Sequence, residues 1–312
     1  MEKIKNVNFG DRPEMVLKFQ SIQIRKTGTN GDYASLVGFD GEDLIDVKIW
    51  SLPEEKKELL KPGEIYFVTG LIKDYQGKKQ FNVSDFRLAS DDEVNKDAFY
   101  EYAPLSKEEL QKKISGYIAK IKNPILNKIV ITVLKKYVND YFEYPAAVSI
   151  HHNFIGGLAY HVYSMLNLAD AYLKQYPYLN SDLVYSGIIL HDIGKVKELS
   201  GSKSVEYTKA GNLLGHISIG ANIVSRECEK LGVLDTEEAT CLIHMILAHH
   251  GEMEFGSPKE PLMAEAALLY YLDYTDSRLA ALTKYYGATN KGEYTDQIFA
   301  FDKKSFYIPN ID

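Results

Sequence analysis

The histidines of this chain are confined to one window. All eight lie between residues 151 and 250, although this window is less than a third of the 312 residues. They are His151, His152, His161, His191, His216, His244, His249 and His250. Asp192, Asp273 and Asp276 accompany them. Because divalent transition metals accept imidazole nitrogens and carboxylate oxygens as ligands, this clustering predicts a metal centre.

The adjacent pair His191-Asp192 is the strongest single element. Neighbouring residues on a helix point about 100° apart, so the pair can hold one ion only from a helix terminus or together with side chains of other helices. The run GIILHDIGK fits this arrangement. An apolar helix delivers the pair, Gly194 ends that helix, and Lys195 is placed to meet a phosphate.

Helical periodicity begins at about residue 106 and positions all of these side chains. Ser106 and Glu109 have the spacing of a capping box ahead of an amphipathic stretch to about Lys122, and Pro124 opens a second helix to about Phe142. Further helices are predicted at roughly 157–175, 182–193, 215–231, 236–250 and 261–284. The pattern predicts an all-helical domain over residues 106–312.

The N-terminal part has a different pattern. Residues 15–88 contain short β-rich runs separated by turn signals, and in one run Ile45, Val47 and Ile49 alternate with Asp46, Lys48 and Trp50. Five or so strands, with SLPEEKKELL as a short helix between the third and fourth, predict a small barrel of the OB type over residues 1–90. The acidic, weakly patterned residues 91–105 are interpreted as a linker.

Bulk composition narrows the class of protein. The chain has 45% apolar and 25% charged residues, two cysteines outside any zinc-binding spacing, and no apolar run long enough to span a membrane. We therefore expect a soluble protein of the reducing cytoplasm with no membrane partner. A net charge of −7 argues against a protein that coats duplex nucleic acid, because such binding requires a broad basic face.

Five blocks, in this order, resemble the metal signature of the HD superfamily in its longer, two-metal form. They are HHNFIGGLAYHVYSML, GIILHDIGKVKELS, LLGHISIG, LAHHGEMEFGSP and EAALLYYLDYTDSRL. With the barrel in front and the ending FDKKSFYIP, nearly the whole chain resembles the YhaM family of bacterial 3′-to-5′ exoribonucleases. The resemblance implies a small all-β OB-type barrel followed by an all-α HD domain.

The resemblance also implies two sets of metal ligands that share Asp192. One ion would be held by His161, His191, Asp192 and a late aspartate, and the other by Asp192, His216, His249 and His250. For the late aspartate we favour Asp273, since the first aspartate of such a D-x-x-D is usually the ligand in related sequences. Asp276 is the alternative, or a residue that orients a histidine ligand.

Two divalent ions would activate a water and neutralise charge on the attacked phosphate, so no protein nucleophile is required. Lys195 would stabilise the non-bridging oxygens in the transition state. His151 and His152 are candidates for contacting the substrate or protonating the leaving oxygen. The resemblance implies manganese, while the ligand types also admit iron, cobalt or zinc.

A metal site predicts phosphoester hydrolysis but does not identify the ester. The barrel face with Lys48 and Trp50 offers the aromatic and basic mixture that binds single strands, although a lone tryptophan in a small barrel can also belong to the core. With the resemblance, this favours a 3′-to-5′ exoribonuclease acting on single-stranded RNA, with single-stranded DNA as a further substrate.

Two alternatives stay open at this point. One is an HD phosphodiesterase or phosphohydrolase acting on cyclic dinucleotides or free nucleotides, although the Gly-Tyr-Pro element of the cyclic-dinucleotide enzymes is absent from the sequence. The other is a catalytically silent binding module, which retention of every candidate ligand disfavours. The oligomeric state is also open, and a homo-oligomer would help a short barrel hold a long strand.

Overall fold

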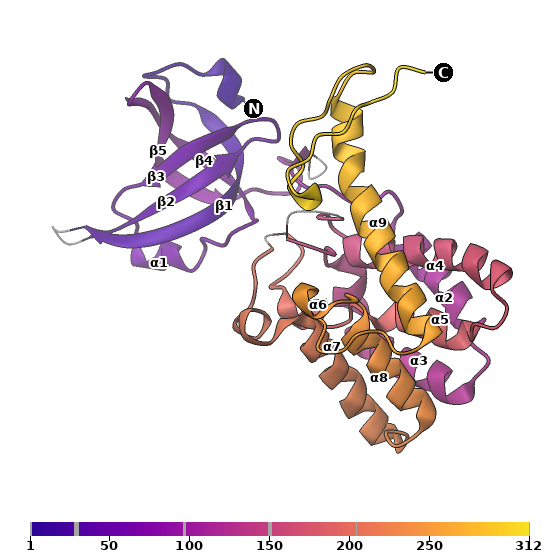
Figure 1. Cartoon of the computed structure of the whole chain (residues 1–312). Helices are drawn as coiled ribbons and strands as arrows, with labels where there is room; N and C mark the ends of the chain where they lie inside the picture. The colour runs from indigo at the N-terminus through magenta and orange to yellow at the C-terminus, as the bar shows by residue number, and fades with distance from the viewer. Residues whose placement is uncertain (1, 28–30, 96–97, 149–151, 204, 312) are drawn as a thin grey trace. The chain divides into compact units, whose positions relative to one another are not determined.

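The structure is a computed structural model of the whole chain, and it describes residues 2–27, 31–95, 98–148, 152–203 and 205–311 (Figure 1). The chain divides into two compact units, Met1–Glu101 and Tyr102–Asp312. Part of the segment interpreted as a linker belongs to the first unit, because Phe99 and Tyr100 are buried there and the Tyr100 hydroxyl donates a hydrogen bond to the carbonyl of Gly63.

The first unit is a closed barrel of five strands. They are β1 (Glu14–Thr27), β2 (Gly31–Phe39), β3 (Leu44–Ile49), β4 (Ile65–Tyr75) and β5 (Lys78–Leu88). Their order around the barrel is β1-β2-β3-β5-β4, in which only the pair β3 and β5 is parallel. The short helix α1 (Glu54–Lys57) lies between β3 and β4, and the 3-10 turn η1 (Ile4–Asn6) precedes β1. This confirms the predicted OB-type barrel with a helix after its third strand.

The alternation predicted in β3 is also confirmed. Ile45, Val47 and Ile49 are buried in the barrel core, whereas Asp46 and Lys48 point outward. A strand alternates its side chains between two faces, so a single register fixes both the core and the outer surface.

The second unit is built from helices. They are α2 (Lys107–Ile118), α3 (Pro124–Glu143), α4 (Gly157–Gln175), α5 (Ser181–Leu190), α6 (Lys195–Glu198), α7 (Lys209–Leu231), α8 (Glu237–Ala248) and α9 (Ala264–Ala288), with 3-10 turns η3 (Met253–Phe255) and η4 (Phe299–Phe301). The capping box predicted for Ser106 and Glu109 is present at the start of α2. None of the helices in the described part of the chain is both long and apolar enough to cross a membrane.

Helix α5 forms the centre of this unit. Its residues Val184, Ile188, Ile189 and Leu190 are completely buried, and the helix packs against α3, α4, α8 and α9. A helix that is apolar on all sides must be surrounded by other elements. Since His191 and Asp192 follow directly at its C-terminal end, a helix that is packed against these four others sets their position.

Two expectations about helix ends were wrong in detail. The helix predicted at 182–193 ends at Leu190, and Gly194 does not terminate it through a left-handed conformation, since its φ is −62°. Glycine is required there because an added Cβ would lie 1.9 Å from the carbonyl oxygen of His216. The helix predicted from residue 215 begins at Lys209 instead and bends at Gly215, whose φ is 70°.

The chain after α9 turns back along that helix (Figure 1). Isolated β-bridges join Tyr294 to Tyr307 and Ile298 to Lys304, and Ile298 is buried. The turn η4 contacts α9. The C-terminal segment therefore adds side chains to the surface of the helix that carries Asp273 and Asp276.

Candidate metal centre

Five helices deliver the predicted ligands to one place. His161 lies on α4, His191 and Asp192 follow α5, His216 follows the bend in α7, His249 and His250 follow α8, and Asp273 and Asp276 lie on α9. The side chains of His161, His191 and His249 are completely buried, and Asp192 is 2% exposed. Burial of so many polar groups is costly unless each of them finds a partner.

Asp192 lies at the centre of the cluster. Its Oδ2 is 3.3 Å from Nε2 of His191 and 4.0 Å from Nε2 of His161. Its Oδ1 is 3.4 Å from Nε2 of His216 and 3.7 Å from Nε2 of His249. The two carboxylate oxygens therefore divide the histidines into two groups, as a carboxylate that bridges two ions would.

Backbone carbonyls fix the orientation of two of the rings. Nδ1 of His191 donates to the carbonyl of Ile188 over 2.8 Å, and Nδ1 of His249 donates to the carbonyl of Ile246 over 2.7 Å. A carbonyl oxygen can only accept, so the proton of each neutral ring is on Nδ1. The Nε2 lone pairs therefore point into the cluster.

His216 is oriented by a carboxylate. Glu198 Oε1 accepts from the backbone N–H of His216 over 2.8 Å and lies 3.1 Å from its Nδ1. The positive φ of Gly215 turns the chain so that both bonds form at the bend of α7. The backbone N–H and the ring of His216 are thereby tied to the same buried side chain.

His161 has a carboxylate on each side of its ring. Its Nδ1 is 2.7 Å from Oδ2 of Asp276, and its Nε2 is 3.2 Å from Oδ1 of Asp273. Burial alone would lower the pKa of His161, but the two carboxylates outweigh it and raise the pKa to about 9. This geometry favours Asp273 as ligand and Asp276 as the group that orients the ring, which stays a prediction.

Several buried atoms of the cluster have no hydrogen-bond partner among the described residues. They are Nε2 of His191, His216 and His249, and Oδ1 of Asp192. Unsatisfied buried polar atoms are rare in proteins, and here they converge on one place. The donor set thus fits divalent metal ions, whose binding would satisfy all of these atoms.

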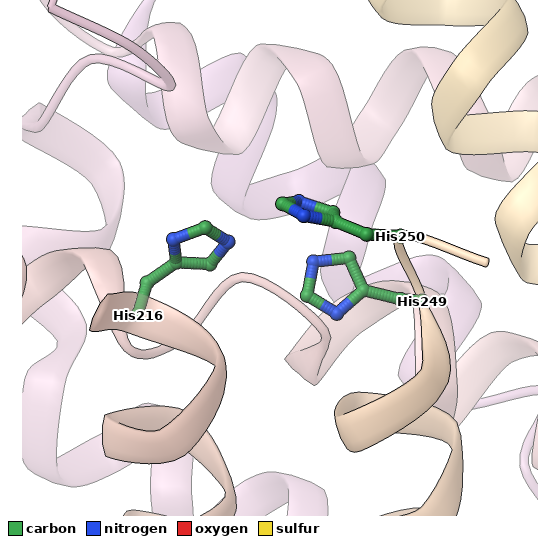
Figure 2. Close-up of side chains that lie close together, drawn as sticks. All are labelled: His216, His249 and His250. Carbon is green, nitrogen blue, oxygen red and sulfur yellow. The ribbon is translucent and has the colours of Figure 1, made fainter. Parts of the chain in front are cut away.

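Four groups of ligand atoms in the described residues are close enough to share an ion, with all atoms of a group within 4.8 Å of one another. They are His161, His191 and Asp273; His191, Asp192 and His249; His216, His249 and His250; and His152, His161 and Asp276. Figure 2 shows the third group, in which the rings of His249 and His250 are 4.5 Å apart at their centroids. The groups overlap through shared residues, as expected of a centre with two ions.

Lys195 is the first residue of α6 and lies against the centre. Its Nζ is 2.8 Å from Oδ2 of Asp192, and the residue is only 8% exposed. Burial acts to raise the pKa of Asp192, but the charge of Lys195 and the neighbouring rings of His191 and His216 hold that pKa well below its usual value. Asp192 is therefore ionised and ready to bind metal.

His152 and the other predicted substrate contacts lie in different surroundings. His152 is buried, and its Nε2 is 2.8 Å from Oδ2 of Asp276. His151 lies outside the described residues. Lys48 and Trp50 belong to the barrel, where Lys48 donates a hydrogen bond to Ser35. His244 stands apart from the metal cluster and accepts a hydrogen bond from the backbone of Leu262.

A cavity of about 180 Å³ opens beside the centre. It is lined by Lys195, His250, Tyr270, Asp273, Tyr274, Ser277 and Arg278. Sequence reasoning missed Arg278, and it also missed Glu198 and Ser164, whose hydroxyl donates to Oδ1 of Asp276. No local pattern marks these residues, because each acquires its role from a partner on another element.

Comparison with known protein families agrees with this geometry. Residues 158–278 match the model of the HD domain. The matched segment contains every predicted metal ligand, from His161 to Asp273. The helical unit therefore contains an HD domain over residues 158–278, which indicates a metal-dependent phosphohydrolase.

Proposed function

We propose that this protein is a 3′-to-5′ exoribonuclease of the YhaM type, which hydrolyses single-stranded RNA to nucleoside monophosphates. The observation that carries the proposal is the division of the histidines between the two oxygens of Asp192, in a chain that also contains an OB-like barrel. A two-ion centre can catalyse phosphodiester hydrolysis, and such a barrel can provide a binding surface for single-stranded nucleic acid.

Two divalent ions, manganese being the first choice, would be held by two ligand sets. The first is His161, His191, Asp192 and Asp273, and the second is Asp192, His216, His249 and His250. When bound, the ions would lower the pKa of a water at the centre and neutralise charge on the attacked phosphate. The remaining steps depend on side chains of the chain itself.

Lys195 is the side chain placed to stabilise the transition state. Its ammonium group lies beside Asp192 and also lines the cavity, so it faces both the centre and the space for substrate. A cation held in this position would stabilise the negative charge that develops on the non-bridging oxygens of the phosphate. The hydrogen bond from His152 to Asp276 supports a role in orienting that carboxylate, and proton transfer from His152 to the leaving oxygen stays a prediction.

The barrel surface supports the choice of RNA. Trp50 is 52% exposed, so it is not a core residue, and its ring stacks on Tyr33 with centroids 5.1 Å apart. Lys48 lies on the same outer face of β3. The bases of single-stranded nucleic acids stack on exposed aromatic rings, and basic side chains beside these rings contact the backbone phosphates.

The test is a time course on 5′-labelled single-stranded RNA, with manganese added or chelated, beside an Asp192→Ala variant. A ladder that shortens from the 3′ end only with metal and only with Asp192 supports the proposal. Intact RNA together with cleavage of a cyclic dinucleotide or a free nucleotide would replace it with the alternative HD phosphodiesterase. Single-stranded DNA in the same assay defines the range of substrates.

A further inference from the structure

The cavity beside the metal centre is lined by two cations with different surroundings. Lys195 forms an ion pair with Asp192, whose Oδ2 lies 2.8 Å from its Nζ. Arg278, which follows Asp273 on α9 and lines the same cavity, forms no ion pair with any residue in the described part of the chain. A guanidinium group that lines a cavity and has no ion-pair partner is suited to bind an anion.

Arg278 is also held in place. Its Cζ lies 4.9 Å from the ring centroid of Tyr274, one turn earlier on α9, and 5.2 Å from that of Phe301, in the C-terminal segment. Contact with the aromatic faces uses the flat surfaces of the guanidinium group and leaves its N–H edge available. The C-terminal segment thus contributes Phe301 to the positioning of a residue beside the centre.

The chemistry of the neighbouring centre limits what the anion can be. A phosphodiester at the metal ligands and Lys195 is the scissile group. In a nucleic acid strand the next charged group along the chain is another phosphate, and the fork of an arginine matches phosphate oxygens in a bidentate manner. Arg278 lines the same cavity as Lys195, so one substrate can reach both side chains.

We propose that Arg278 binds a second phosphate of the substrate, the one next to the scissile phosphodiester on its 5′ side. The proposal rests on the function proposed above, and it adds a determinant of substrate class. The site selects substrates with at least two neighbouring phosphates over isolated phosphodiesters. Tyr274 and Phe301 act as positioning residues, because both of their rings contact the guanidinium group.

The probe is a pair of dinucleotides that differ in one group. The dinucleoside monophosphate NpN carries only the scissile phosphate, whereas its 5′-phosphorylated form pNpN carries the second one as well. Calorimetric binding is measured with chelator present, so that turnover does not interfere, and kcat/KM is measured with manganese. Bis(p-nitrophenyl) phosphate serves as an isolated diester that reports on the metal centre alone.

For the unaltered protein we expect tighter binding and a higher kcat/KM for pNpN than for NpN. Arg278→Gln should reduce the ratio of kcat/KM for pNpN to that for NpN by a factor of about 10 to 100, as expected for a lost charge-assisted hydrogen bond. The loss should appear mainly in KM. Arg278→Lys keeps the charge but loses the fork, so it should retain only part of the preference.

Arg226→Gln is the matched control. Arg226 is exposed on α7, and the substitution removes the same charge without touching the cavity. It should leave the preference for pNpN and the hydrolysis of the isolated diester unchanged. Thermal unfolding of all variants establishes that they are folded under assay conditions.

An equal loss by Arg278→Gln for pNpN, NpN and the isolated diester would overturn the proposal, because it would place Arg278 at the scissile phosphate. An unchanged preference would also overturn it. If the unaltered protein leaves RNA intact but hydrolyses the isolated diester, the proposed exoribonuclease function is rejected, independently of the proposal for Arg278. In that case the same variants are compared on a cyclic dinucleotide, which carries two phosphates, and an equal loss on it and on the isolated diester rejects the inference.

Discussion

Oδ2 of Asp276 lies 2.7 Å from Nδ1 of His161, on the edge of the ring opposite to the one that faces Asp273. The same oxygen lies 2.8 Å from Nε2 of His152, and Ser164 donates a hydrogen bond to the other carboxylate oxygen. The two oxygens of Asp276 are therefore occupied by one proposed ligand ring, that of His161, and by His152 and Ser164, which belong to neither ligand set. A carboxylate with this surrounding can fix a ligand ring without itself binding the ion.

The first prediction separates the two aspartates of α9. Asp273→Ala should abolish binding of one ion, because it removes a ligand. Asp276→Ala should lower the affinity for that ion by roughly 10- to 100-fold and leave the number of ions bound at saturation unchanged. Manganese titration followed by electron paramagnetic resonance measures both. The opposite ranking of the two variants would make Asp276 the ligand.

The second prediction concerns Glu198, which holds both the backbone and the ring of His216. Glu198→Ala should lower the affinity for the ion of the His216 set by ~10-fold or more, while the affinity for the ion of the His161 set stays almost the same. Metal content after dialysis should fall toward one ion per chain at limiting concentration. Equal weakening of both ions would show that Glu198 supports the whole fold rather than one ligand.

The third prediction tests the close approach at Gly194. Gly194→Ala would place a Cβ 1.9 Å from the carbonyl oxygen of His216, so α6 and α7 must separate. We expect a loss of stability of about 1–3 kcal/mol in chemical denaturation, accompanied by weaker metal binding. Gly116→Ala is the control, because Gly116 lies in α2 with nothing within 4 Å of the added Cβ. That change should stabilise the protein by about 0.5–1 kcal/mol.

Gly194 also shows where sequence reasoning stops. Residue types and their order were sufficient to predict the barrel, the helices and the set of candidate ligands, because alternation, helical periodicity and ligand chemistry are local properties. The requirement for glycine at 194 comes from His216, which lies 22 residues further on in another helix. The sequence suggested a helix terminus instead, which is the commoner reason for a glycine at such a position.

Glu198 and Arg278 were missed for the same reason. The role of Glu198 depends on the bend at Gly215, and that of Arg278 depends on Phe301, which reaches α9 only because the C-terminal segment turns back. These are contacts between elements, and no periodicity within one element encodes them. The choice between Asp273 and Asp276 could be argued from the sequence only through resemblance, whereas the structure gives each carboxylate different partners.

The fourth prediction is a pH dependence of stability away from the metal centre. Asp170 accepts hydrogen bonds from the hydroxyls of Tyr185 and Tyr117 and pairs with Lys120. Burial acts to raise the pKa of Asp170, but these partners outweigh it and lower the pKa below its ordinary value. A carboxyl group with a lowered pKa in the folded state stabilises the protein above its unfolded pKa, and this contribution is lost as the pH falls through the folded pKa.

Asp170→Asn should therefore lower the free energy of unfolding near pH 7 by no more than about 1 kcal/mol, since the group is partly exposed and screened. The difference between the variant and the unaltered protein should shrink as the pH is lowered from 5 toward 3. Urea unfolding curves at each pH measure it. A difference that stays constant over this range would show that the hydrogen bonds of Asp170 do not depend on its charge.

The fifth prediction asks whether the barrel holds the substrate. Trp50→Ala removes a ring that is 52% exposed and packed on Tyr33, so the barrel should remain folded while RNA binding weakens by about 10-fold or more. Tyr75→Ala is the control, because Tyr75 is 57% exposed at the end of β4, next to the turn to β5. Fluorescence anisotropy with labelled single-stranded RNA measures the affinity. Because the metal centre lies in the other unit, hydrolysis of bis(p-nitrophenyl) phosphate should be the same in both variants, and a parallel loss of that activity would contradict a role of Trp50 in binding alone.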